Sequence, residues 1–168
     1  MISTKGRYAL RVMIDLAEHD DGGYTPLKDV AERQNISKKY LEIIVKDMVA
    51  GGLLTGASGK GGGYKLNRTP EKYTVGEILE LMEGPLAPVA CLIKDSNECP
   101  RADSCQTLPI WAEFDTLVHD FFYGKTLADM LKNEYNGQKK SAFSILPEKA
   151  DWFFFLYRMI TRPAWYRP

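Results

Sequence analysis

The chain has 168 residues, of which 45% are apolar and 26% charged, with 22 basic and 22 acidic side chains. This length and composition predict a folded protein with one ordinary domain and an appendage. No uncharged run approaches the roughly 18 apolar residues of a membrane span, and no apolar signal segment follows Met1, so we expect a cytoplasmic protein.

Charge is segregated along the chain although the total is zero. Lys and Arg outnumber Asp and Glu by 11 to 8 in residues 1–70, whereas acidic residues dominate by 12 to 5 in residues 71–135. Residues 136–168 are basic again, by 6 to 2. Because local charge steers association, we expect an anionic partner to meet the first segment.

The first segment carries the pattern of a helix-turn-helix. Apolar residues recur at three- and four-residue intervals over residues 6–19, which predicts a helix with one buried face. Thr25 is predicted to cap a short second helix whose first residue is Pro26, and Asn35 fits the left-handed residue of a tight turn. Ser37 can cap a third helix. Two short helices joined by a tight turn favour DNA binding, with the later helix reading the bases.

A glycine-rich loop follows, flanked by the apolar-containing runs 53–58 and 64–67, and this pattern predicts a β-hairpin. The loop fails the phosphate-loop motif G-x-x-x-x-G-K-[ST], because Leu54 stands at the first glycine and Gly61 follows Lys60. It also lies between strands and opens no helix. We therefore interpret it as the wing of a winged helix, in which Lys60 and Lys65 can meet phosphates. An exposed flexible turn is the alternative.

The acidic segment predicts further helices. Residues 74–82 have helical spacing, with Thr74 and Glu77 in the arrangement of a capping box. Thr107 and Pro109 predict the start of a helix with an apolar face wider than a small domain needs. That face is interpreted as a dimer seam, with packing inside one subunit as the alternative, and residues 126–131 predict a further capped turn.

All three cysteines, Cys91, Cys99 and Cys105, lie in the turn-rich stretch between these helices. In a reducing compartment an odd, clustered set of thiols indicates metal binding or redox chemistry rather than a disulfide. Three thiolates suit an iron–sulphur cluster. Zinc fits the spacing C-x₇-C-x₅-C poorly, because structural zinc takes four ligands at shorter spacings. Three unrelated thiols, or His119 as a remote fourth ligand, are the other interpretations.

Residues 136–168 follow the polar linker NGQKK and hold eight of the nineteen aromatic residues. The run Trp152-Phe153-Phe154-Phe155 is too short to span a bilayer. Docking on the dimer is the favoured interpretation. Binding of a protein partner or of a membrane surface stays open.

Three stretches carry a resemblance to a known family: TKGRYALR at 4–11, SKKYLEIIVKDMVAGGLL at 37–54 and GKGGGYKL at 59–66. They resemble the Rrf family of winged-helix regulators, which includes IscR, NsrR and CymR types, and the match covers about residues 1–135. The resemblance implies a homodimeric transcription factor and not an enzyme, mainly α with a small β-hairpin wing. Its parts would be a winged helix-turn-helix (1–70), a cysteine loop with a long dimerisation helix (71–135) and an extension of unknown role (136–168).

The resemblance also assigns double-stranded promoter DNA as the partner, with helix 37–50 in the major groove and the wing along the minor groove. Lys can donate to guanine or to phosphate, and Glu can accept from cytosine N4. Ser58 stands where the family often has arginine, a departure for which Lys60 can compensate. The assigned residues are Thr4, Lys5, Arg7, Ser37, Lys38, Lys39, Tyr40, Glu42, Lys46, Ser58, Lys60, Gly61, Gly62, Gly63 and Tyr64.

For the cysteines, the resemblance implies a cluster that senses iron–sulphur status, redox stress or nitric oxide. Leu108 occupies the position of the histidine that completes the site in the IscR branch, and Arg7-Tyr8 that of the carboxylate in some NsrR types. We therefore expect a [4Fe–4S] cluster with a nonprotein or remote fourth ligand, with [2Fe–2S] as the alternative. A cluster-free regulator controlled by a protein partner, as in CymR, is the second hypothesis. A thiol oxidoreductase is disfavoured because the chain lacks C-x-x-C.

Overall fold

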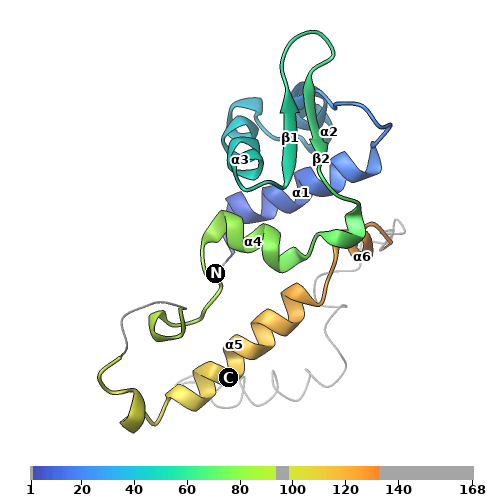
Figure 1. Cartoon of the computed structure of the whole chain (residues 1–168). Coiled ribbons are helices and arrows are strands. Elements are labelled where there is room, and N and C mark those ends of the chain that lie inside the picture. The colour runs from blue at the N-terminus through green and yellow to red at the C-terminus, as the bar shows by residue number, and fades with distance from the viewer. Residues whose placement is uncertain (1, 94–98, 133–168) are drawn as a thin grey trace, which may run out of the picture. The chain divides into compact units, whose positions relative to one another are not determined.

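The computed structural model describes residues 2–93 and 99–132, which form a mostly helical unit with one antiparallel β-hairpin, as predicted (Figure 1). The helices are α1 (Thr4–Glu18), α2 (Leu27–Gln34), α3 (Lys38–Ala50), α4 (Val75–Glu83), α5 (Leu108–Tyr123) and α6 (Leu127–Lys132). The strands are β1 (Leu54–Ala57) and β2 (Gly63–Leu66), paired from Leu54 with Leu66 to Ala57 with Gly63. The predicted extension 136–168 lies outside the described residues.

Helix α1 begins two residues before the predicted start, because Ser3 caps it. The Ser3 hydroxyl accepts hydrogen bonds from the Lys5 and Gly6 amides at 3.0 and 3.4 Å. Such a cap contributes about 1 kcal/mol to helix stability. The inward face of α1 then joins α2, α3 and the hairpin in one apolar core. Its fully buried members include Val12, Met13, Leu41, Ile44, Val45, Met48 and Leu53.

The prediction of Thr25 as the cap of α2 is wrong by one residue. The Thr25 backbone forms a bridge with β2, donating to the Tyr64 carbonyl at 3.0 Å and accepting from the Tyr64 amide at 2.9 Å. Pro26 is consequently the cap residue, and its side chain makes no capping bond. Gly63 permits this contact, since a Cβ there would lie 2.1 Å from the Thr25 carbonyl oxygen. The wing is thereby tied to the segment that enters α2.

The turn between α2 and α3 confirms two local predictions. Asn35 has φ 52° and ψ 48°, the left-handed conformation that ends α2. The Ser37 hydroxyl accepts from the Tyr40 amide at 3.2 Å and caps α3. The tight turn therefore fixes the angle at which α3 leaves α2, as a helix-turn-helix requires.

A buried carboxylate joins α1 to α2. Asp15 is 0% exposed, and Arg33 donates to both of its oxygens at 2.6 to 3.2 Å. Gln34 donates to Asp15 Oδ2 at 2.9 Å. A buried charge is tolerated only when it is paired and hydrogen-bonded in this way.

A buried tyrosine joins the hairpin to α4. The Tyr73 ring is 0% exposed, and its hydroxyl donates to the Leu53 carbonyl at 2.9 Å. The same oxygen accepts from the amides of Asn67 and Arg68, both at 2.8 Å. One side chain thus fixes both ends of the hairpin.

Helix α4 has its predicted cap but only half of the predicted capping box. The Thr74 hydroxyl accepts from the Glu77 amide at 3.1 Å. The Glu77 carboxylate instead pairs with Arg68 at 2.6 Å, because the residues that follow β2 bring a cation to its side. The cap predicted at Thr126 is confirmed, since its hydroxyl accepts from the Asp129 amide at 3.1 Å.

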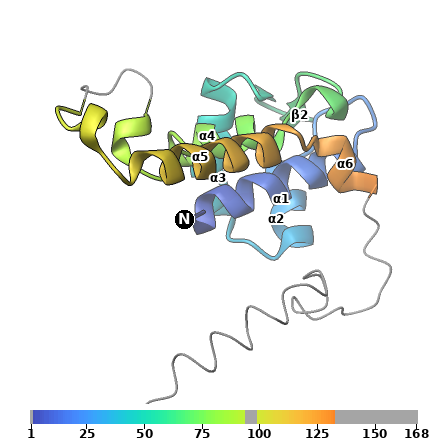
Figure 2. The ribbon, with the colours of Figure 1, turned by 90° about the horizontal axis from the view of Figure 1, so that it is seen from below.

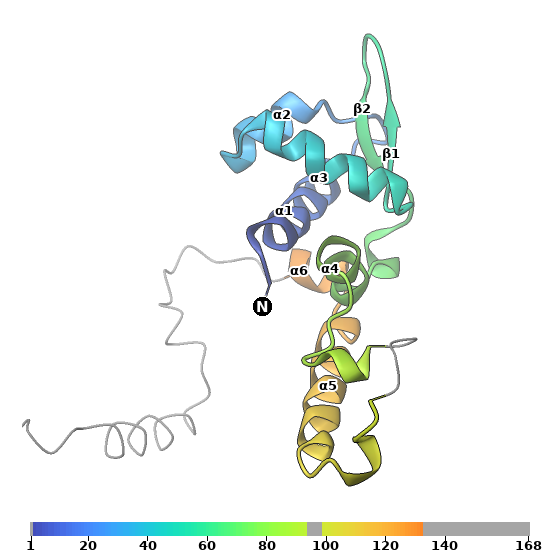
Figure 3. The same ribbon diagram turned by 90° about the vertical axis from the view of Figure 1, so that its left-hand side faces the viewer.

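The chain between α4 and α6 leaves from one end of α4 and returns to the other. After α5, Thr126 forms an antiparallel bridge with Thr74, and the Val75 amide donates to the Lys125 carbonyl at 2.8 Å. The Leu127 amide donates to the Tyr73 carbonyl at 2.9 Å. Figures 2 and 3 show α5 beside α4, with α6 next to α1.

Helix α5 leaves its apolar side chains exposed. None of its residues is buried; Leu108, Val118 and Phe122 are half-buried, and several other large apolar side chains are exposed. The exposed fractions are Ile110 63%, Phe114 49%, Leu117 61% and Phe121 60%. Among the described residues, these four side chains are not packed inside the subunit, whereas Val118 and Phe122 line a pocket with Ile2 and residues 85–88. The dimer seam stays a prediction. Among the described helices, none combines the length and the apolar run needed to cross a membrane.

Candidate nucleic-acid interface and cysteine segment

The side chains assigned to DNA contact come from the start of α1, from α3 and from the hairpin. The hairpin projects beyond the end of α3 (Figures 1 and 3). On α3, Lys38 lies 3.6 Å from Glu42, both more than half exposed, so their charges remain available to a ligand. The exposed members of the set are Thr4, Arg7, Ser37, Lys38, Lys39, Glu42, Lys46, Ser58, Lys60 and Gly61, and the half-buried ones are Lys5, Tyr40, Gly62, Gly63 and Tyr64.

An aromatic contact fixes Tyr40 near the start of α3. Its ring meets Tyr8 of α1 edge to face, with centroids 5.8 Å apart. The Arg11 guanidinium lies over the Tyr8 ring, 5.3 Å from its centroid, and also donates to the Gln34 carbonyl. Tyr8 and Arg11 therefore hold the exposed part of Tyr40 in one orientation.

The beginning of α1 lies against α3. Lys5 Nζ is 2.7 Å from Asp47 Oδ2 of α3, which places this cation beside the helix that the sequence predicts to enter the major groove. Arg7 makes local contacts instead, donating to the Ser3 carbonyl at 3.4 Å and to the Thr4 hydroxyl at 3.1 Å. Lys5 and Arg7 are thus presented by the same turn that Ser3 caps.

The wing has a tight, exposed tip. Gly61 adopts φ +78°, and the Gly62 amide donates to the Gly59 carbonyl at 3.0 Å. Lys60 at the tip is exposed. Lys65, which the sequence also suggested for phosphate contact, lies 4.7 Å from the centre of the Tyr24 ring. It therefore supports the base of the wing.

Sequence reasoning missed Ile43, whose side chain is 53% exposed on α3. The search for helical spacing identified the inward set and passed over the apolar residue between its members. A helical projection would have placed it outside the buried stripe, on the face expected to meet DNA.

The three cysteines lie on the segment that joins α4 to α5. Cys91 and Cys99 are exposed and Cys105 is half-buried, and short 3₁₀ turns at Ala90–Leu92 and Ala102–Ser104 lie beside them. Within residues 2–93 and 99–132, no three His, Cys, Asp or Glu side chains lie close enough together to hold a metal ion. The structure therefore confirms that the thiols share one accessible segment but does not bring them together.

A carboxylate connects this segment to the start of α1, which carries the assigned residues Thr4, Lys5 and Arg7. Glu83 is the last residue of α4, directly before the cysteine segment. Its Oε1 accepts from the Ser3 amide at 3.0 Å, the Ser3 hydroxyl at 2.8 Å and the Gly6 amide at 3.0 Å. A negative charge at a helix N-terminus is favourable, since it meets unpaired amides and the positive end of the helix dipole. The start of α1 is thus bound to the point where the cysteine segment begins.

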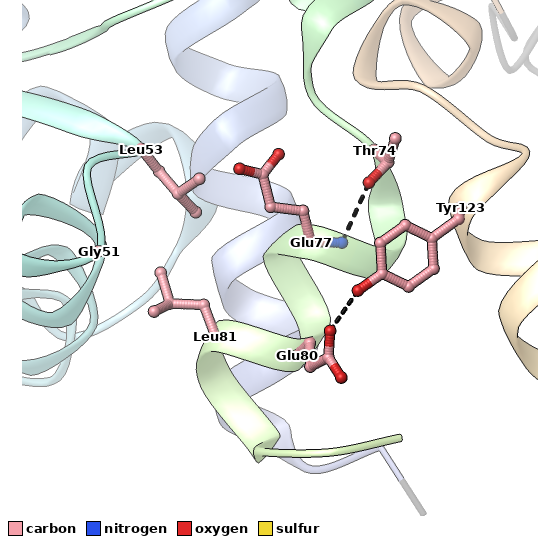
Figure 4. Close-up of a pocket in the computed structure, with 7 residues that line it drawn as sticks. All are labelled: Gly51, Leu53, Thr74, Glu77, Glu80, Leu81 and Tyr123. Carbon is pink, nitrogen blue, oxygen red and sulfur yellow. Dashed lines mark hydrogen bonds between the residues drawn. The ribbon is translucent and has the colours of Figure 1, made fainter. Parts of the chain in front are cut away.

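A pocket of about 550 Å³ lies where the end of α3 meets α4 and the end of α5 (Figure 4). Its two carboxylates are already engaged, Glu77 by Arg68 and Glu80 by the Tyr123 hydroxyl. Partial desolvation of a ring that remains 39% exposed, and then the bond to Glu80, raise the pKa of Tyr123 to about 12, so the phenol stays protonated. At this pocket, the bond between Tyr123 of α5 and Glu80 of α4 links the two helices.

Comparison with known families decides the identity of this fold. A family model described as "Rrf2: Iron-dependent Transcriptional regulator" matches residues 2–133. The chain belongs to the Rrf2 family. It is a transcriptional regulator with a DNA-binding winged helix and not an enzyme, as the sequence predicts.

Individual Rrf2 proteins agree with this assignment. The IscR regulator of Erwinia tasmaniensis is 32% identical over 133 residues, which span 79% of this chain and 79% of that protein. CymR, the global cysteine regulator of B. subtilis, has a TM-score of 0.64 and 35% identity over 79% of this chain and 96% of its own. The IscR structure of T. potens has a TM-score of 0.62 and 32% identity, covering 87% of this chain and 96% of that one.

The histidines of this Rrf2 chain lie away from its thiols in sequence and have other contacts. His19 follows α1, and its Nδ1 is 2.8 Å from the Asp15 carbonyl. His119 lies on α5, with Nδ1 2.9 Å from the Asp115 carbonyl and its ring stacked on Tyr123 at 5.8 Å. In each case the contact engages only Nδ1, and a bond from one ring nitrogen to a carbonyl is compatible with a surface role and with metal ligation through the other nitrogen.

One thiol of the Rrf2 chain has an altered acidity that an experiment can measure. Hydrogen bonds from the Thr107 hydroxyl, 3.4 Å from the Cys105 sulfur, and from the Thr107 backbone lower the pKa of the Cys105 thiol. Thr107→Val removes the hydroxyl, so this pKa is expected to rise and alkylation of Cys105 to slow near neutral pH. The measurement is the iodoacetamide rate against pH, in metal-free protein carrying Cys91→Ser and Cys99→Ser. Superimposable profiles with and without Thr107→Val would contradict the assignment.

Proposed function

We propose that this Rrf2 protein regulates transcription by sensing iron–sulphur status, redox stress or nitric oxide through an iron–sulphur cluster on Cys91, Cys99 and Cys105. The observation that carries the proposal is the position of the thiols. All three belong to the accessible segment between α4 and α5, in a chain that matches a family described as iron-dependent. The IscR relatives support the same conclusion.

The donor set fits such a group in chemistry. Three cysteine sulfurs are the usual ligands of iron–sulphur clusters, and the lowered pKa of Cys105 favours its thiolate. Leu108 offers no fourth ligand next to Cys105. We therefore favour a [4Fe–4S] cluster with a nonprotein or remote fourth ligand over [2Fe–2S]. When bound, the cluster would supply a centre that reacts with oxygen, nitric oxide or thiols.

DNA binding would use the exposed set on α1, α3 and the wing. The N-terminal half of α3 is the part that reaches base edges in helix-turn-helix proteins, and it carries Lys38, Lys39 and Glu42. Lys60 at the wing tip would contact the backbone. The exposed apolar face of α5 supports a homodimer in which two such units meet adjacent half-sites.

The contacts of Glu83 offer a route from the thiols to DNA. A change in the order of the cysteine segment acts first on the end of α4, where Glu83 holds the amides of Ser3 and Gly6. The same turn presents Thr4, Lys5 and Arg7. DNA affinity changes only if the two states of this turn bind DNA unequally.

We expect the regulator to act in the cytoplasm. A protein partner, if one exists, would engage the extension 136–168, which lies outside the described residues. This part of the proposal rests on the aromatic and basic composition of that segment.

The proposal is tested by an ultraviolet–visible spectrum, with iron and acid-labile sulfide assays, on protein purified without oxygen. We expect a brown protein whose absorbance near ~400 nm and bound iron are lost in the variant with all three cysteines replaced by serine. About four irons and four sulfides per chain support [4Fe–4S], and about two of each support [2Fe–2S]. Air or nitric oxide should bleach the spectrum and change the affinity of the protein for DNA sites selected from a random-sequence library.

The second candidate is a cluster-free regulator controlled by a protein partner. The likeness to B. subtilis CymR favours it, at 35% identity and a TM-score of 0.64. Its expected result is a colourless, iron-free protein whose DNA affinity is unchanged when the three cysteines become serine. That outcome would overturn the cluster and leave DNA binding intact.

A further inference from the structure

The exposed face of α3 is centred on an apolar side chain. Leu41, Ile44, Val45 and Met48 are buried, and Ile43 is 53% exposed. At about 100° per residue, Ile43 lies about 150° around the helix from the mean direction of that buried set. Ile43 therefore points away from the core and toward whatever α3 meets.

Ile43 lies in the part of α3 that corresponds to the base-contacting part of a recognition helix. It is the sixth residue of Lys38–Ala50, within the N-terminal half. The exposed residues Lys39 and Lys46 lie one turn before it and one turn after it on the same face. With one cation on each side of Ile43, the helix would be held to phosphates or guanine edges, and the isoleucine would lie over the bases between them.

Base edges in the major groove differ in what they offer an apolar side chain. Adenine, guanine and cytosine present donors and acceptors, whereas thymine also presents its C5-methyl group. The isoleucine side chain has no polar atom, so against a donor or acceptor of a base it would displace water without forming a hydrogen bond in its place. Against the thymine methyl it removes apolar surface from water on both sides.

We infer that Ile43 reads a thymine, by contact with its 5-methyl group, in the DNA half-site that α3 enters. This inference rests on the DNA-binding function of the chain and adds a residue that determines its base preference. Ile43 would supply specificity, whereas Lys39 and Lys46 supply affinity.

The test removes only the methyl group. Duplexes are first selected from a random-sequence library with the wild-type protein, and each thymine of the recovered site is then replaced singly by deoxyuridine. We expect one position per half-site at which the wild type binds the deoxyuridine duplex roughly 3- to 10-fold more weakly. Ile43→Ala should bind the two duplexes equally, and Ile43→Val should retain part of the preference.

Val49→Ala is the matched control, because Val49 is also an exposed apolar residue of α3, 39% exposed, and lies near its C-terminal end. It should keep the full deoxyuridine effect. The inference is overturned if the wild type tolerates deoxyuridine everywhere, or if Ile43→Ala keeps the same loss; Ile43 is then an incidental surface residue. Failure to enrich any sequence would overturn specific DNA binding itself, and the inference with it. If Ile43→Ala fails to fold, Ile43→Val takes its place, and an undiminished deoxyuridine effect in that variant would overturn the assignment to Ile43.

Discussion

Substitution of Arg33 by methionine is expected to lower the free energy of unfolding by about 3 kcal/mol. Asp15 is 0% exposed in the wild type, and in the variant it keeps only the hydrogen bond from Gln34, so its charge is left without its cation. We expect the lower end of the range for broken buried pairs, because the Arg33 side chain is 31% exposed and water can enter where it stood. Methionine retains most of the aliphatic contact, which isolates the loss of charge.

The measurement is urea denaturation of metal-free protein followed by circular dichroism. The midpoint should fall while the slope stays constant. Lys28→Met on the same helix is the control: Lys28 and Glu32 are 75% and 67% exposed and 3.6 Å apart, so the loss should stay within about 0.5 kcal/mol. Equal effects of the two substitutions would show that the Asp15 pair does not hold α2 against α1.

Tyr73→Phe should have the second large effect, a loss of about 2 to 3 kcal/mol. The phenylalanine ring fills the same space, but the Arg68 amide loses its bond to the hydroxyl, and the Leu53 carbonyl and the Asn67 amide keep only a long bond to each other at 3.4 Å. Each polar group that loses its bond inside the protein keeps the cost of its desolvation. The ring contact with Arg68, at 4.3 Å, remains in the variant, so the loss reports the hydroxyl alone.

Thermal and urea unfolding of the Tyr73→Phe protein measure this loss, with Tyr123→Phe as the control. The Tyr123 hydroxyl bonds to Glu80 at an exposed site, where water can replace it, so its removal should cost under about 1 kcal/mol. If the Tyr73 variant unfolds with the wild-type midpoint, the hairpin is held by its apolar contacts and not by this hydroxyl.

Features set by neighbouring residues could be predicted from the sequence. Asn35, Ser37 and Thr126 act on backbone groups within about four positions, and side chains of that type have few other local roles. The hairpin followed from its glycines in the same way. The number and order of the helices therefore needed no knowledge of tertiary contacts.

The features that could not be predicted depend on distant partners. Glu83 meets Ser3 across 80 positions, and Thr25 meets Tyr64 across 39 positions of the sequence, so no spacing in the sequence indicates either contact. Glu77 was assigned to a capping box because the sequence does not show that Arg68 lies beside it once the hairpin has folded. In the structure Arg68 binds the carboxylate that the capping box would have used. Of the candidate site, the elements that carry the assigned residues were predicted correctly. Their contacts with DNA and with a cluster stay predictions.

The return of the chain to α4 makes the cysteine segment and α5 an exchangeable insert. Glu83 at one end of α4 and the Thr74–Thr126 bridge at the other lie about 13 Å apart along a nine-residue helix, and everything between them is one excursion. Lengthening a loop whose ends are held costs free energy only with the logarithm of its length. Evolution can therefore alter the number and spacing of thiols there without disturbing the core beneath α3. The same DNA-binding domain can then serve regulators that respond to different chemical signals.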